Sequence, residues 1–366
     1  MSKTALKLCS ILLFLILIFN TVSISAVAVN VSEDGNLPYS ESECLSEINV
    51  SVKDFTNESD GVTEVKENCI ITGHLGKVGW LFNVPKDGAY NIRFKYVPVE
   101  DGGGSIERTL YIDGELPCDE VSSVVFSRTY QNSESTVKDS NGNDIRPMQK
   151  EHVRTMELTL RDPAEIIQGE LVFNLSSGEH LLELEALRES LGIYEIIFVP
   201  VTKQLTYSEY IKRFNKETSK AEIITVEAEN AQYKSNSTIY PISDNNASAT
   251  PQDPVKIRLN TIGADKWNTA GQWIEWEIDV ETDGLYKIVP RFMQNAYDGG
   301  YVTRRLEIDG KVPFAEAEKI RFNYENAWQT KALGDKNQEF LFYLTKGTHS
   351  FKMYVTIRMN VSLFRP

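Results

Sequence analysis

An internal repeat constrains the fold of this chain more than any other feature of its sequence. Residues 79–92 (GWLFNVPKDGAYNI) match 275–288 (EWEIDVETDGLYKI), and Asp87 and Asp283 within them lie 283 − 87 = 196 residues apart. At the same spacing, 108–114 (RTLYIDG) match 304–310 (RRLEIDG). Residues 173–180 match 342–349 at a spacing of 347 − 178 = 169, so the first copy carries an insertion of 196 − 169 = 27 residues, which we place in the polar stretch 131–150. Self-similarity over this length predicts two copies of one domain.

The pattern within each copy is typical of antiparallel β-structure. In residues 273–280 (WIEWEIDV), apolar side chains alternate with acidic ones, which predicts a strand with one buried face. Asp-Gly pairs follow the strands in both copies and favour turns. The one convincing helix begins after Thr206, where Thr206 and Glu209 can form a capping box, and runs to about Lys216. We therefore predict an all-β chain of two tandem antiparallel β-sandwiches joined by a short helix.

The N-terminus has the composition of a secretory signal peptide. Lys3 and Lys7 precede the apolar run 11–19, and the small residues at 26–28 favour cleavage after Ala28. Cleavage of this signal helix would change the net charge from −14 to −16, because it removes two lysines and no acid. An uncleaved membrane anchor is the alternative. Either way we expect a secreted or cell-surface, extracytoplasmic protein.

Three cysteines remain after such a cleavage. Cys44, Cys69 and Cys118 are an odd number, so one of them is unpaired in a monomer. A Cys44–Cys69 disulfide and three reduced thiols are both compatible with the spacing.

Charge and motif content exclude several function classes. With 52 acidic against 38 basic residues, the chain lacks the basic footprint that nucleic acids and anionic membranes require, so we expect membrane contact only through an uncleaved signal segment. Hydrolase, zinc-protease and phosphate-loop motifs are absent from the sequence. His180 and His349 occupy the same Gly-x-His position in both copies, which indicates turn architecture rather than a catalytic base. We predict that the chain is not an enzyme.

Five short motifs of the second copy form a recognisable combination. They are Glu-Ala-Glu at 227–229, Gly-x-Trp at 271–273, Asp-Gly-x-Tyr at 283–286, the segment 304–310 and Gly-x-His at 347–349. The combination resembles carbohydrate-binding modules of families six and thirty-five, which implies a jelly-roll, galactose-binding-like sandwich. Residues 142–147, 248–260 and 313–318 further resemble the N-terminal region of large bacterial sugar-type ABC transporter solute-binding proteins. In those proteins two such sandwiches precede a solute-binding domain, and the resemblance covers about residues 60–358.

The repeat and the resemblance together predict the domain limits. We expect a signal peptide at 1–28, a partly irregular extension at 29–59, repeat one at 60–204, a helical linker at 205–221 and repeat two at 222–366. In repeat one a strand-like run covers 192–199, and its counterpart in repeat two would begin at 361. We therefore expect repeat two to lack most of its last strand, which leaves a sheet edge unpaired and the repeat marginally stable. The resemblance implies a solute-binding domain that this sequence lacks, as in a truncated gene product.

Candidate ligand residues are found in repeat two, and the aromatic ones lie in predicted loops. Sugar recognition needs aromatic faces and planar polar side chains. Trp276 matches Trp80 and is expected in the core, whereas the candidate site uses residues outside the shared core pattern. Its aromatic members are Trp267, Tyr297 and Trp328, and its hydrogen-bonding members are Asn260, Asn295 and Arg304. Arg304 recurs as Arg108, which suits a structural salt bridge in both copies equally well.

Glu227 and Glu229 have a separate role in the resemblance, which implies a structural Ca²⁺ site there. Carboxylate oxygens suit this hard cation, and residues i and i+2 share one face of a strand. Two solvated carboxylates are the alternative. Repeat one has no Glu-x-Glu at the matching place, so we expect no equivalent site in it.

The sequence therefore favours a non-catalytic extracytoplasmic carbohydrate-binding protein. Its expected partner is a polysaccharide or oligosaccharide, with an ABC transporter permease as a further partner through the missing domain. Two alternatives stay open. One is an accessory module or fragment related to a glycoside hydrolase, and the other is a structural spacer without ligand binding.

Overall fold

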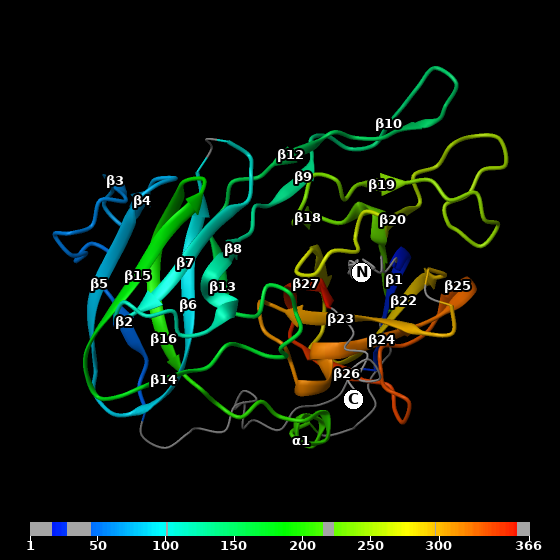
Figure 1. Ribbon diagram of the computed structural model, residues 1–366. Helices are drawn as coiled ribbons and strands as arrows, with labels where there is room; N and C mark the ends of the chain where they lie inside the picture. The colour runs from blue at the N-terminus through cyan, green and yellow to red at the C-terminus, as the bar shows by residue number, and fades with distance from the viewer. Residues whose placement is uncertain (1–16, 28–44, 100–101, 215–222, 297, 357–366) are drawn as a thin grey trace, which may run out of the picture.

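The computed structural model describes residues 17–27 (backbone only), 45–99, 102–214, 223–296 and 298–356. About half of these residues form antiparallel strands (Figure 1). The buried apolar side chains separate into two clusters, one in each repeat. The predicted all-β fold of two tandem sandwiches is confirmed.

Repeat one is a sandwich of two sheets. The first follows the order β13 (Met156–Thr159), β6 (Gly88–Pro98), β16 (Leu191–Pro200), β4 (Ile70–Thr72), β3 (Val62–Val65), with β14 (Phe173–Leu175) beside β6 and β2 (Ile48–Val50) beside β16. The second follows β5 (Lys77–Val84), β15 (Gly178–Arg188), β7 (Ile106–Ile112), β8 (Val124–Phe126), and the 3₁₀ helix η1 (Asp119–Ser123) precedes β8. Because β2 pairs with β16, the sandwich begins by residue 48, earlier than the expected start at 60.

Repeat two has the same two-layer plan. One sheet follows β19 (Pro241–Ile242), β20 (Thr261–Ala264), β1 (Leu17–Val27), β22 (Gly284–Gln294), β25 (Glu325–Thr330), with β17 (Ile223–Glu227) beside β1 and β26 (Leu341–Leu344) beside β22. The other includes β18 (Tyr233–Lys234), β21 (Trp273–Val280), β27 (Gly347–Thr356), β23 (Tyr301–Ile308), β24 (Ile320–Asn323). The 3₁₀ helices η2 (Ala228–Asn230) and η3 (Ala315–Lys319) lie in its connections.

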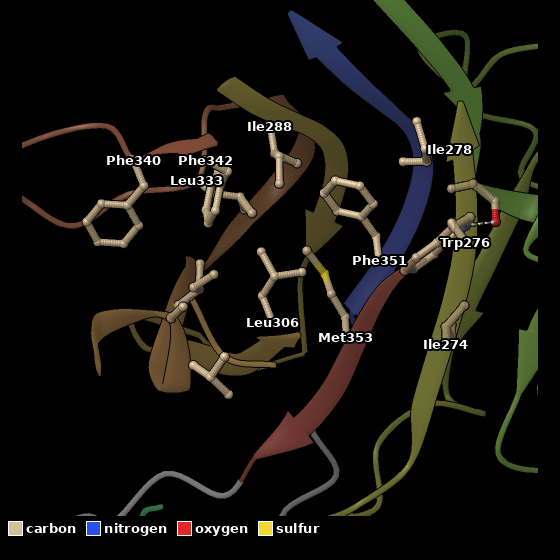
Figure 2. Close-up of a cluster of buried hydrophobic side chains, with 14 of the residues drawn as sticks. Ile274, Trp276, Ile278, Ile288, Leu306, Leu333, Phe340, Phe342, Phe351 and Met353 are labelled. Carbon is tan, nitrogen blue, oxygen red and sulfur yellow. Dashed lines mark hydrogen bonds between the residues drawn. The ribbon is translucent and has the colours of Figure 1, made fainter. Parts of the chain in front are cut away.

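The paired tryptophans sit in matching places in the two cores. Trp80 and Trp276 are both buried, and each indole Nε1 donates to a backbone carbonyl at 2.9 Å, of Val52 and Ala228 respectively. Figure 2 shows Trp276 packed with its neighbours on β21 and β27, among them Phe351. Alternation along β21 puts the apolar side chains on the core side, as the sequence predicts.

The Gly-x-His turns are built identically in both repeats. Nδ1 of His180 lies 2.6 Å from Oδ2 of Asp113, and Nδ1 of His349 lies 2.6 Å from Oδ2 of Asp309. The other ring nitrogen contacts the carbonyl four residues upstream, at 2.9 and 2.8 Å. Each histidine thereby ties one Asp-Gly turn to the next hairpin. The structural interpretation of these histidines agrees with their contacts.

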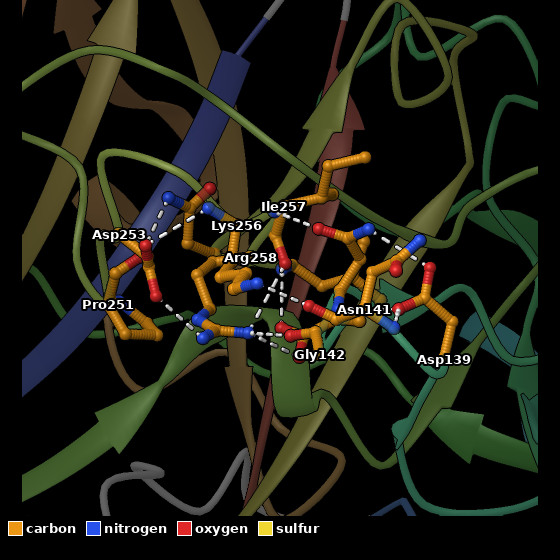
Figure 3. A network of polar contacts seen from close by, with 12 residues as sticks. Asp139, Asn141, Gly142, Pro251, Asp253, Lys256, Ile257 and Arg258 are labelled. Atoms are coloured by element: carbon orange, nitrogen blue, oxygen red, sulfur yellow. Dashed lines mark hydrogen bonds and ion pairs between the residues drawn. The ribbon is translucent and has the colours of Figure 1, made fainter.

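The insertion of repeat one forms an arm that joins repeat two. Its base is the hairpin of β9 (Tyr130–Asn132) and β12 (Gln149–Glu151), and β9 pairs with β18, so one sheet of seven strands crosses the boundary between the repeats. The tip carries the short strands β10 (Val137–Lys138) and β11 (Asp144–Ile145). Figure 3 shows this tip bound to the loop at 251–258, where Arg258 donates to the carbonyl of Gly142 at 2.9 Å and pairs with Asp144 at 3.2 Å. The insertion is therefore a connection between domains.

The helix between the repeats is shorter than expected. The capping box of Thr206 and Glu209 is confirmed, but α1 covers Tyr207–Ile211, and residues 215–222 lie outside the described part of the chain. Of the helices in the described residues, none has the length and apolar character that a bilayer span requires. Cys69 is buried, and its suggested partner Cys44 lies outside the described residues.

The expected open edge of repeat two is closed by a segment from the other end of the chain. Strand β1 pairs with β22, β17 and β20, the same three kinds of neighbour that β16 has in β6, β2 and β4. The expectation of an unpaired edge is therefore wrong for the described fold, and residues 17–27 form a strand rather than part of a signal helix. Residues 1–16 and 28–44, which make up the rest of the signal segment and most of the extension, are outside the described residues, as are 357–366.

Candidate functional site

Trp267, the first aromatic candidate, is part of the core. Its side chain is 0% exposed, Nε1 donates to the carbonyl of Gln272 at 3.3 Å, and its ring lies 4.4 Å from the guanidinium carbon of Arg304. The sequence places Trp267 in a polar loop, but it does not show that this loop folds over the end of β23. A buried indole offers no face to a sugar, so the predicted stacking role of Trp267 does not fit its position.

Arg304 is equally enclosed. The guanidinium donates to the carbonyls of Thr303 and Trp267 at 2.8 and 3.1 Å, and burial lowers the pKa of Arg304 to about 9. Its counterpart Arg108 is also buried and donates to the carbonyls of Gly73, Arg188 and Glu189 at 2.7–3.0 Å. The arginine shared by the repeats therefore clamps backbone carbonyls. This structural role does not fit the predicted ligand contact.

Asn260 holds a loop together. Its side-chain amide donates to the carbonyls of Asp244 and Pro251 at 3.0 and 2.9 Å, and its Oδ1 accepts from the backbone N–H of Asp244 at 2.8 Å. These bonds fix the loop that follows β19 against the start of β20. Because Asn260 is buried and its groups are used in this way, the predicted ligand contact does not fit it either.

Trp328 remains accessible and is held in a defined orientation. It lies on β25 between the exposed Ala327 and the buried Gln329, with its own side chain partly exposed. Nε1 donates to Oδ2 of Asp244 at 3.1 Å, and Asp244 is fixed by Asn260. Sequence reasoning missed Asp244, because the loop that carries it is more than 80 residues from Trp328.

An arginine faces the same side of this sheet as Trp328. Arg291 on β22 pairs with Thr330, and Trp328 precedes Thr330 by two residues, so the side chains of Arg291 and Trp328 point away from the core. The Nε of Arg291 is buried and has no hydrogen-bond partner among the described residues. The neighbouring Phe292 is in the core. We call Asp244, Arg291 and Trp328 the outer-face site.

Asn295, another predicted ligand residue, lies at the end of the same sheet. Asn295 is exposed directly after β22, whose last residue, Gln294, pairs with Glu325 at the start of β25. Tyr297 is outside the described residues. Of the six predicted ligand residues, the structure thus leaves Trp328 and Asn295 accessible on one side of repeat two.

The carboxylate pair lies across β1 from Arg291. Glu227 ends β17, and Glu229 lies in the turn η2, so the two do not share a strand face as predicted. The two carboxylates nevertheless interact. Burial and, to a smaller extent, the charge of Glu227 raise the pKa of Glu229 to about 8. Burial also raises the pKa of Glu227, and in each residue Oε2 is buried without a hydrogen-bond partner among the described residues.

These two side chains fit two positions of a Ca²⁺ site. Uncompensated buried carboxylates are costly, and a hard cation with oxygen ligands would offset that cost. Among the described residues, no cluster of three or more acidic, histidine or cysteine side chains could hold a metal ion. The other ligands would therefore be carbonyl, amide or water oxygens.

A cavity of about 1070 Å³ lies between the repeats, and several charged side chains in its walls pair with one another. Arg154 and Lys352 both contact Glu275, and Arg161 forms two hydrogen bonds of 2.9 Å with Glu318. Lys352 also covers the ring of Trp273 at 4.7 Å. These ion pairs make the cavity part of a polar interface between the repeats.

No protein-family model matches the chain, and none of the curated proteins matches it. Similar solved structures include the GH26-CBM35 β-(1,4)-mannanase of Podospora anserina, with 11% identity, 42% of this chain and 26% of that chain covered, and a TM-score of 0.24. A family GH115 4-O-methyl-α-glucuronidase with specificity for decorated arabinogalactans has 12% identity, 44% and 18% coverage and a TM-score of 0.23. A Paenibacillus sp. cycloisomaltooligosaccharide glucanotransferase, complexed with cycloisomaltoheptaose, has 10% identity, 90% and 47% coverage and a TM-score of 0.20.

All three of these proteins are carbohydrate-active, and the first includes a module of family thirty-five, one of the two that the motifs of repeat two resemble. The chain spans less than half the length of each of them. The low TM-scores limit this likeness to a general one.

Proposed function

We propose that this chain is a non-catalytic, extracytoplasmic carbohydrate-binding protein and that repeat two binds the glycan at the outer-face site. The observation that carries the proposal is the partly exposed indole of Trp328, which Asp244 orients on the face of the sheet that also carries Arg291. The Nε of Arg291 has no hydrogen-bond partner among the described residues. An aromatic face can pack on the C–H face of a sugar ring, and a planar donor can bind its hydroxyl groups. Asn295 would extend the site at the end of β22.

A finer proposal concerns the system in which the protein works. The resemblance to sugar-type ABC transporter solute-binding proteins supports a role in, or descent from, a sugar-uptake system. The signal-like composition of residues 1–28 supports the extracytoplasmic location. We also propose that Glu227 and Glu229 hold a structural Ca²⁺ beside β1.

A glycan array with the Trp328→Ala variant tests the site. We expect the wild-type chain to bind a defined set of glycans and the variant to bind them about ten- to a hundredfold more weakly, since a stacked ring and its buried area contribute about 1.4–2.8 kcal/mol. Tyr194→Ala is the matched control, because Tyr194 is a partly exposed aromatic on the last strand of repeat one. Its affinity should equal that of the wild type.

Other outcomes would favour the other function classes. If no glycan binds to a folded chain, a structural spacer is favoured. Release of reducing sugar from plant polysaccharides would establish an enzyme. If the Trp328→Ala variant binds glycans as tightly as the wild type, the outer-face site is not where the glycan binds.

A further inference from the structure

One strand position in repeat two is filled by a segment that lies far from the repeat in the sequence. Strands β17 and β20 pair with one side of β1, and β22 pairs with the other. Among the described strands, neither β17 nor β20 pairs directly with β22, so β1 alone joins the two parts of this sheet. We call the space between these parts the strand slot.

Repeat one shows what kind of strand belongs in the slot. There the same position is taken by β16, which follows β15 directly in the chain and runs antiparallel to β6 and β4. In repeat two β1 runs antiparallel to β22 and β20, with Ile24 opposite Ile288 on β22 and Ile224 on β17. The slot therefore has the same direction in both repeats, although its occupant is the last strand of the repeat itself in repeat one and an N-terminal segment in repeat two.

The slot is defined by a buried framework. Tyr286, Ile288 and Phe292 of β22 belong to the core of repeat two, and Ile224 and Val226 of β17 pack against that core. A vacant slot would leave the backbone N–H and C=O groups along β22 unpaired next to apolar side chains. Such an edge binds an extended strand by main-chain hydrogen bonds.

We propose that repeat two is a strand-accepting domain whose slot binds an extended, apolar peptide segment antiparallel to β22. In the whole chain the occupant is Leu17–Val27, which has the composition expected of a signal segment. A chain that has lost this segment accepts an apolar strand of the same kind in trans. The proposal does not depend on glycan binding, since the slot lies within the sheet.

Disulfide trapping in the whole chain tests the register of the strand. Ser23 lies directly opposite Thr225, and opposed Cα atoms in antiparallel pairs are about 4.5–5.5 Å apart, within the range that a disulfide bridges. Under mild oxidation we expect the Ser23→Cys/Thr225→Cys variant to form this link, identified by peptide mass. The matched control is Ser23→Cys/Ile223→Cys, because Ile223 lies opposite Ser25, about 7–8 Å diagonally from Ser23. Equal yields in both variants, or no link in the first, would overturn the proposed occupant.

Deletion of residues 1–28 tests strand capture. We expect the shortened chain to lose the cooperative transition of repeat two and to bind dye at exposed apolar surface. A synthetic peptide of residues 17–27 should restore the transition with saturable binding, whereas a peptide with the same residues in scrambled order should not. If the shortened chain unfolds like the whole chain and binds neither peptide, the strand-accepting role is wrong. If the shortened chain cannot be produced in a folded form, the disulfide trapping experiment with the Ser23→Cys/Thr225→Cys variant tests the proposal on its own.

Discussion

The two repeats use one design and complete it in different ways. Both have the buried tryptophan bonded to a carbonyl, the arginine that clamps backbone and the histidine-aspartate turn. Repeat one supplies its own last strand and adds an arm, whereas repeat two receives a strand from the N-terminus and docks the arm. The comparison teaches that a sandwich requires a strand at each position of its sheets, but does not require the strands to follow a fixed order along the chain.

The largest expected effect tests whether the two cores are equivalent. Trp80→Ala and Trp276→Ala should each cost about 3–5 kcal/mol of unfolding free energy, because each removes a large buried side chain and its hydrogen bond. We expect the melting temperature of the mutated repeat to fall on the order of 10 °C. Hydrogen exchange read by mass spectrometry assigns each transition to a repeat. If one of the two substitutions lowers the unfolding free energy by an amount outside this range of about 3–5 kcal/mol while the other stays within it, the two cores are not equivalent.

The second test concerns the carboxylate pair, a feature of repeat two alone. Because the folded-state pKa of Glu229 is raised to about 8, its stabilising contribution is complete below the ordinary carboxyl pKa and is lost as pH rises through about 8. Without Ca²⁺ we expect repeat two to lose about 1–3 kcal/mol between pH 4.5 and 8. Calorimetry across this range measures the loss.

Glu229→Gln and Ca²⁺ provide the controls for that test. The variant, which has no charge at this position, should show a flatter pH dependence. Added Ca²⁺ should raise the transition temperature of repeat two in the wild type, with little change in the variant or in repeat one. The same Ca²⁺ response in wild type and variant would contradict the metal site.

The smallest effect concerns the turn in repeat one. The hydrogen bond to Asp113 raises the pKa of His180, so its stabilisation is complete below the ordinary histidine pKa near 6.5 and is lost as pH rises through the raised value. Since Asp113 is about half exposed, we expect a change of roughly 0.5 kcal/mol or less between pH 6 and 8. In denaturant titrations, the His180→Gln variant should lack this pH-dependent change in stability, whereas the control variant Glu179→Gln should retain it. If the unfolding free energy of the His180→Gln variant depends on pH as strongly as that of the wild type, the pH dependence does not come from this turn.

Much of the fold could be predicted from local sequence. Alternation around Trp276, the Asp-Gly turns and the capping box at Thr206 all depend on neighbours close in the chain, and the repeat extends the first two to a second copy. The arm could not be identified from its polar sequence. Its partners, such as Arg258, lie more than 100 residues away and bind mainly its backbone and acidic groups.

The candidate site could be predicted only in part, for the same reason. Residue type identifies Trp328 and Asn295 as candidates, and both are accessible, although Trp328 lies on strand β25 rather than in the expected loop. The sequence does not predict Trp267 as a core residue, because the guanidinium that packs on its ring belongs to Arg304, 37 residues further on. Strand β17 ends at Glu227, two residues before Glu229, so the alternation of a strand does not extend to Glu229 and the two side chains do not share a strand face.

The sheet that crosses the boundary means that the two repeats are held together by more than the chain segment between them. Tyr130 of the arm pairs with Lys234, whose buried ammonium donates to Asn132 and Gln149 at 2.8 and 3.1 Å. Arg161 and Glu318 form a further pair between the repeats. A protease that cut the chain between residues 215 and 222 would therefore produce a nicked protein rather than two free fragments. The halves would migrate together in gel filtration and separate only under denaturing conditions.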